Sequence, residues 1–164
     1  MLKMKASGNI SRMISVAVLL CSVMFMGSFT QTNAVRMKWT GYVIHGFEGE
    51  SDVHFIGTVP NGWKIYSKNM TSGNGPLATS IEFDPSDAYE LVGEMTETGK
   101  ASKFYDSQYG FEVSCVEGQV HYIQHIKIKT ADAAFTIKAV ANYMLNRSGE
   151  SLSPDDEDFE ITIQ

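Results

Sequence analysis

The chain has 164 residues, of which 43% are hydrophobic and 20% charged, and its formal net charge is −6. Residues 1–34 hold three of the 13 basic residues and no acidic one, so the remainder carries a net charge of −9. Such an acidic balance argues against binding to nucleic acid and to anionic membrane surfaces.

The first 34 residues have the three regions of a secretory signal peptide. Lys3, Lys5 and Arg12 precede an apolar run from 14 to 29. The small residues Thr32 and Ala34 then form the expected cleavage site. The run is shorter than the roughly 20 residues that a membrane-spanning helix needs. We predict a signal peptide at 1–34, one domain at 35–164 and a periplasmic or secreted protein without an integral membrane segment after cleavage. A retained N-terminal anchor is the alternative.

Two cysteines are present, and Cys21 lies inside the predicted signal peptide. Cys115 is then the one cysteine of the mature chain, which excludes an internal disulfide. It alternates with polar neighbours on a predicted strand, so we interpret it as a small buried hydrophobic residue.

The mature chain is predicted to form short strands separated by turns. In its first half, strands at 53–56 and 63–66 flank a Pro-Asn-Gly turn at 60–62. A loop at 72–76 and a turn at 84–87 flank a further strand around Ile81 and Phe83.

The second half shows clearer alternation of apolar and polar residues. Strands are expected at 111–115, 120–129, 135–143 and 159–163, with a hairpin turn at Glu117–Gly118. About eight or nine strands without a helical period predict an all-β, immunoglobulin-like sandwich of two sheets. The predicted core consists of Trp63, Tyr122, Ile126, Ile128, Phe135, Ile137, Tyr143, Phe159 and Ile161.

No metal, cofactor or catalytic constellation is predicted from the residues alone. His121 and His125 are about 13 Å apart on an extended strand, too far to share an ion. The acidic run at 155–158 lacks the glycine and spacing of a calcium loop, which indicates a solvated acidic loop. No serine-hydrolase, zinc-protease or phosphate-binding motif occurs.

Several segments in order carry a family resemblance. They are Trp39, Gly-Trp-Lys-Ile-Tyr-Ser at 62–67, Gly-Pro-Leu-Ala-Thr-Ser-Ile-Glu-Phe at 75–83, Tyr-Met at 143–144 and Leu-Ser-Pro at 152–154. This order resembles the N-terminal periplasmic domain of the thiol:disulfide interchange protein DsbD. The resemblance implies an immunoglobulin-like sandwich and a reversible disulfide near the C-terminus, which passes electrons from a membrane domain to periplasmic partners.

The redox pair of that family is missing here. Aligning 143–144 and 152–154 with the family pattern places Asn146 and Ser151 where its two cysteines belong, so no catalytic residue is predicted. The family also shields its disulfide with an aromatic cap loop, which corresponds to residues 100–110. Candidate cap or partner-binding residues are therefore Phe104, Tyr105, Tyr109, Leu152 and Pro154.

These observations favour a redox-inactive binding or accessory protein without a cofactor. Its implied partner is a periplasmic thioredoxin-like protein or a membrane component of a disulfide reductase. One alternative is an active thiol–disulfide oxidoreductase component, with sulfur supplied by Cys115 or by a partner. Another is a structural protein of the cell envelope.

Overall fold

The computed structural model describes residues 34–70, 75–129, 134–148 and 150–164. The predicted signal peptide lies outside the described residues, apart from Ala34. Val35–Gln164 forms one compact unit. Its described residues contain ten strands and no helix, which confirms the all-β prediction, and no membrane-spanning helix occurs among them.

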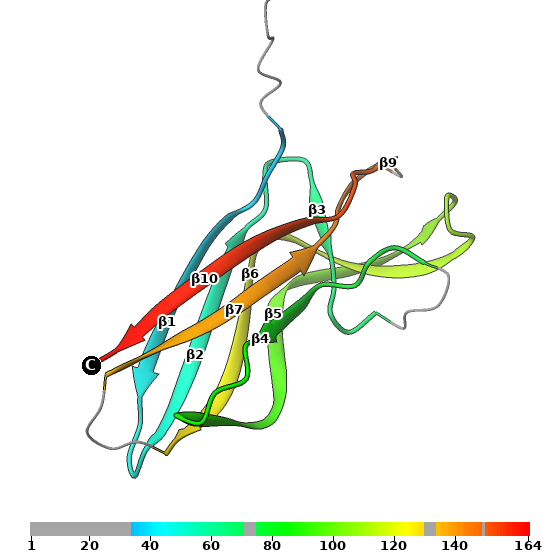
Figure 1. The fold of residues 1–164 in the computed structure, drawn as a ribbon. Helices are drawn as coiled ribbons and strands as arrows, with labels where there is room; N and C mark the ends of the chain where they lie inside the picture. The colour runs from blue at the N-terminus through cyan, green and yellow to red at the C-terminus, as the bar shows by residue number, and fades with distance from the viewer. Residues whose placement is uncertain (1–33, 71–74, 130–133, 149) are drawn as a thin grey trace, which may run out of the picture. The chain divides into compact units, whose positions relative to one another are not determined.

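The strands form two antiparallel sheets (Figure 1). The seven-stranded sheet has the order β1-β2-β6-β3-β8-β9, with β5 paired to β6. Its members are β1 (Lys38–His45), β2 (Glu50–Thr58), β3 (Lys64–Tyr66), β5 (Tyr89–Asp106), β6 (Phe111–Ile128), β8 (Leu145–Arg147) and β9 (Glu150–Ser151).

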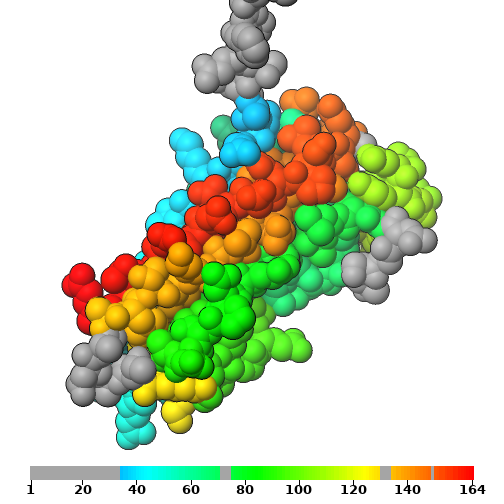
Figure 2. All heavy atoms as spheres, viewed as in Figure 1, coloured from blue at the N-terminus to red at the C-terminus, as the bar shows by residue number. Residues whose placement is uncertain are grey.

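The three-stranded sheet has the order β10-β7-β4 and crosses the front of the space-filling view (Figure 2). It contains β4 (Ser80–Phe83), β7 (Phe135–Tyr143) and β10 (Asp155–Ile163). Period-2 alternation explains why each sheet has one apolar face, and the two apolar faces pack together.

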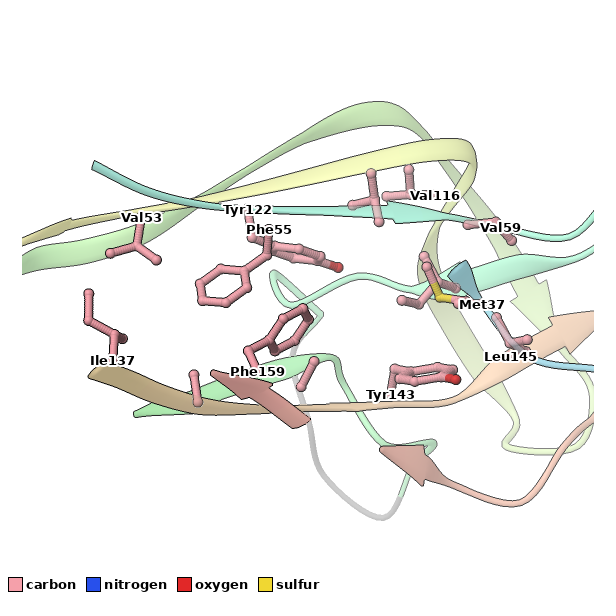
Figure 3. Packing of buried hydrophobic residues seen from close by; sticks show 14 of the residues in the cluster. Met37, Val53, Phe55, Val59, Val116, Tyr122, Ile137, Tyr143, Leu145 and Phe159 are labelled. Carbon is pink, nitrogen blue, oxygen red and sulfur yellow. The ribbon is translucent and has the colours of Figure 1, made fainter. Parts of the chain in front are cut away.

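Aromatic side chains from both sheets fill the space between them (Figure 3). The ring of Phe55 on β2 lies 4.7 Å from that of Phe159 on β10 and 5.7 Å from that of Phe83 on β4. Of the predicted core, Ile128, Phe135 and Ile161 are partly buried against this cluster. The remaining members are buried, as predicted: Trp63, Tyr122, Ile126, Ile137, Tyr143 and Phe159.

One buried residue of β6 was not predicted. Gln124 falls on the core face between Tyr122 and Ile126 and is only 4% exposed. Its amide donates hydrogen bonds to the carbonyl oxygens of Val92 and His125, at 3.2 and 2.9 Å, which offsets the cost of burying a polar group.

The hairpin turn predicted at Glu117–Gly118 was wrong. β6 continues through these residues, and its pairing with β5 shifts there: Gly99 pairs with Val120, but Lys100 pairs with Glu117. Gly118 has a φ of 77°, so the glycine serves a β-bulge rather than a chain reversal. The true connection between β5 and β6 lies at residues 107–110.

The acidic loop predicted at 155–158 was also wrong, because these residues begin β10. Asp155 forms an ion pair with Arg36 at 2.9 Å and accepts a hydrogen bond from Tyr143 at 3.0 Å. β10 is an edge strand of its sheet, and charged side chains on such a strand discourage pairing with another chain.

The chain passes from one sheet to the other at Met144, between β7 and β8. Ile65 and Leu145 face the main core, whereas Tyr66 and Met144 belong to a second apolar cluster. The polar residues described next adjoin this second cluster, on the face of the seven-stranded sheet that points away from the main core.

Candidate functional site

Asn146 and Ser151 are directly opposite each other on β8 and β9. The amide nitrogen of Asn146 lies 3.3 Å from the Ser151 hydroxyl oxygen. At the adjacent pair, the Leu152 N–H donates to the Leu145 carbonyl at 2.9 Å. Because antiparallel pairs alternate, Asn146 and Ser151 occupy a non-hydrogen-bonded position, where side chains approach each other most closely.

The two side chains belong to a buried polar network with Tyr66 and Asp106. The Tyr66 hydroxyl donates to an Asp106 carboxylate oxygen at 2.9 Å. With its one proton used, this hydroxyl accepts from Asn146 at 2.9 Å and from the Ser151 hydroxyl at 2.8 Å. The Gln108 N–H donates to the other Asp106 oxygen. Each member therefore has partners, which is the condition for a stable buried network.

The hydrogen bonds of this network have a structural role. Burial, helped by the charge of Asp106, raises the pKa of Tyr66, so its hydroxyl stays protonated at neutral pH. Amide, hydroxyl and carboxylate groups that are already paired offer neither a thiolate nor an activated nucleophile. The roles of Tyr66 and Asp106 were not predicted, because neither residue lies near Asn146 in the chain.

Cys115 lies on β6 beside this network, paired with Tyr66 in β3 and Ser102 in β5. The side chain is fully buried, as predicted, within the second apolar cluster. Burial raises the pKa of its thiol to about 12. Because the thiolate is the reactive form, Cys115 is a poor nucleophile in the folded protein.

Residues 100–110, which the sequence analysis expected to form a cap loop, are mostly strand. They form the end of β5 and the turn into β6. Phe104 and Tyr109 pack against the second apolar cluster, whereas Tyr105 is 68% exposed. Tyr105 is thus the aromatic side chain of this hairpin that is most available to a partner.

The other two candidate residues, Leu152 and Pro154, lie between β9 and β10. Leu152 is partly buried against the main core. Pro154 is exposed just before β10. Only Pro154 of the two presents its side chain mainly to solvent.

A pocket of about 310 Å³ opens above Asn146. Its walls come from β3, the end of β5 with its turn, and β8. Lysine and arginine side chains line it together with aromatic and hydroxyl groups, and no carboxylate does: Gly62, Lys64, Phe104, Tyr105, Ser107, Asn146, Arg147 and Ser148. The pocket can therefore accept a ligand that carries negative charge.

Three histidines gather on the outward face of the seven-stranded sheet, away from this pocket. His54 Nδ1 lies 2.8 Å from His121 Nε2, and the Tyr42 ring stacks on His54 at 4.9 Å. His125 contacts Asp52 at 2.7 Å. No group of three or more potential metal ligands occurs in the described parts of the chain. The pairing of His54 with His121 joins residues 67 positions apart, and sequence analysis did not predict it.

The His54 pair should make the protein sensitive to mild acid. Burial and the neighbouring His121 lower the pKa of His54, against the opposing effect of Asp52. Below the ordinary histidine pKa of about 6.5, the unfolded chain takes up this proton first, so stability falls as pH decreases. We expect His54→Asn to reduce the change in urea midpoint between pH 7.5 and 5.5.

The exposed His45 supplies the control for this measurement. His45→Asn should retain the full change in urea midpoint between the two pH values. A pH dependence that is the same in His54→Asn as in the unsubstituted protein would contradict the expected role of His54.

Comparisons with known proteins find a structural similarity but no sequence family. No protein-family model matches the chain, and no curated protein matches it. Among solved structures, the chain is similar to the N-terminal periplasmic domain of ScsB from Proteus mirabilis, with 18% identity and a TM-score of 0.51. That alignment covers 76% of this chain and 44% of the ScsB chain.

A second similar structure is the N-terminal domain of DsbD from Neisseria meningitidis in its reduced form. The identity is 16% and the TM-score 0.47, over 74% of this chain and 83% of that chain. At 18% identity, the similarity to the ScsB domain shows the fold of this chain. The sandwich predicted from the strand pattern is therefore confirmed.

Proposed function

We propose that this protein is an exported, redox-inactive binding or accessory protein, built on the sandwich fold shared with the ScsB domain. The observation that carries the proposal is the cross-strand pair of Asn146 and Ser151, joined to Tyr66 and Asp106 by hydrogen bonds. A dithiol/disulfide couple within one molecule needs two neighbouring thiols. Here the corresponding positions hold an amide and a hydroxyl.

The same region supplies the surface for a protein partner. Tyr105 projects from the β5–β6 hairpin, and the pocket above Asn146 opens beside it. Pro154, exposed just before β10, is the other accessible candidate, whereas Leu152 is partly buried against the main core. The chemistry of the resemblance suggests, as partner, a periplasmic thioredoxin-like protein or the membrane component of a disulfide reductase.

Export to the periplasm or the cell exterior is part of the proposal. Support comes from the basic, apolar and small-residue regions of residues 1–34. The structurally similar ScsB domain is itself described as periplasmic.

Assays of thiol chemistry test the proposal directly. The purified protein should neither catalyse insulin reduction by dithiothreitol nor pass electrons to a thioredoxin-like protein. Its one mature thiol should react with Ellman's reagent slowly until denaturant is added, because Cys115 is buried with a raised pKa. Electron transfer that Cys115→Ser abolishes would refute redox inactivity and identify Cys115 as the reactive group.

A further inference from the structure

We propose that the pocket above Asn146 binds an acidic side chain of the protein partner, with Lys64 as the cation that pairs with it. This inference rests on the proposed binding function and specifies the chemistry of the partner. The pocket has two cationic residues, Lys64 and Arg147, and no carboxylate in its lining. Because the whole chain is acidic, such a local excess of positive charge distinguishes this site from its surroundings.

The surroundings of Lys64 leave its charge available. Its ammonium nitrogen lies 3.3 Å from the Ser102 hydroxyl and 5.1 Å from the centre of the Phe104 ring. Among the described residues, no carboxylate forms an ion pair with it, and Glu117, which lines the adjoining pocket, is paired with Lys100. By contrast, Lys100 and Lys103 on the neighbouring arm of β5 each pair with a glutamate. A partly buried cation held by an aromatic ring and a hydroxyl is well placed to accept a carboxylate.

Arg147 has a supporting position. Its guanidinium stacks over the Trp63 ring at 4.5 Å and lies 3.5 Å from a Glu150 oxygen. These contacts fix the guanidinium at the pocket wall and partly neutralise it. Lys64 therefore remains the main determinant of charge recognition.

A second pocket of about 340 Å³ adjoins the first and supports a peptide segment as the proposed occupant. The two pockets share Gly62 and Lys64. The second has apolar walls from Val59, Pro60 and Trp63, and the ion pair of Lys100 with Glu117 also lines it. In an extended peptide, residues i and i+2 point to the same side. An acidic residue in the first pocket would thus place an apolar residue two positions away near the second.

The overall charge argues for a single acidic side chain rather than a polyanion. The predicted mature chain has a net charge of −9, which repels nucleic acids and other highly charged polymers. One carboxylate that contacts Lys64 directly is favoured, because a short ion pair outweighs the screened repulsion from distant charges.

Two short peptides test the proposal. The probes are acetyl-GEGLG-amide and acetyl-GQGLG-amide, titrated into the protein while NMR follows the amide signals of Gly62 and Ser148. We expect the glutamate peptide to bind roughly 3- to 10-fold more tightly than the glutamine peptide. Lys64→Gln should abolish this preference. Lys127→Gln, on the same face of the sheet but near the other end of β6, should retain it.

Equal binding of the two peptides, or a preference that survives Lys64→Gln, would overturn the inference. So would displacement of the glutamate peptide by sodium acetate at concentrations similar to those of the peptide itself. The last outcome would indicate a site for small anions rather than a partner segment. These results do not depend on the thiol assays. A protein that is redox-inactive but shows no peptide preference would refute the inference alone, whereas an active one with the preference would refute redox inactivity alone.

Discussion

Replacing Asn146 and Ser151 together with cysteine should create an internal disulfide and a reversible redox couple that the unsubstituted protein lacks. The two residues face each other at a non-hydrogen-bonded position, where Cα atoms are about 4.5 Å apart, within the range that a disulfide spans. Closing this short loop should make the oxidised variant more stable than its reduced form by about 2 kcal/mol. The measurement is the urea midpoint with and without dithiothreitol, together with a thiol count.

The substitution has a cost that the same experiment shows. Removing the Asn146 amide takes a hydrogen bond from the buried Asp106 and another from Tyr66, a loss of about 1–3 kcal/mol. The reduced variant should therefore be less stable than the unsubstituted protein. The single substitutions Asn146→Cys and Ser151→Cys serve as controls and should not respond to dithiothreitol as monomers. Two free thiols persisting in the double variant after mild oxidation would show that β8 and β9 do not hold the expected geometry.

Ile137→Ala should lower the free energy of unfolding by about 2–5 kcal/mol. Ile137 is completely buried on β7, opposite Ile161 of β10, and its truncation would leave a cavity between the two sheets. Chemical denaturation followed by tryptophan fluorescence measures the loss.

Thr136 is the matched control, because it precedes Ile137 on the same strand and points the other way. Thr136→Ala should change stability by no more than about 0.5 kcal/mol, as is usual for surface positions. A loss of similar size for both variants, or one below about 0.5 kcal/mol for Ile137→Ala, would mean that the register of β7 differs by one residue from the structure.

Alternation along single strands was enough to predict the fold class and much of the core. Ile137, Ala139, Ala141 and Tyr143 are buried as their period of two predicted, because the backbone of a strand turns successive side chains to opposite faces. The same local rule cannot distinguish a turn from a bulge. Gly118 was therefore assigned to a hairpin, although pairing with β5 keeps β6 extended through it.

The candidate site depended on tertiary structure to a greater degree. The sequence by itself predicted that Asn146 and Ser151 stand where the resembled family has its two cysteines, and that Cys115 is the one cysteine of the mature chain. Only the fold shows that Asp106 and Tyr66 meet this pair. Asn146 is 80 residues from Tyr66 and 40 from Asp106 in the chain. Contacts over such separations follow from strand order and register, which no local pattern of residues encodes.

The same physical reason applies to the cysteines and to Lys64 of this protein. That one cysteine follows the predicted signal peptide can be read directly from the sequence, because only residue identities and positions are needed. The accessible charge of Lys64 follows from what surrounds it: Ser102 and Phe104 come from β5, brought beside β3 by β6, which pairs with both strands. Residue identities thus determined how many cysteines follow the predicted signal peptide, whereas strand pairing decided that the Lys64 ammonium lies at a pocket.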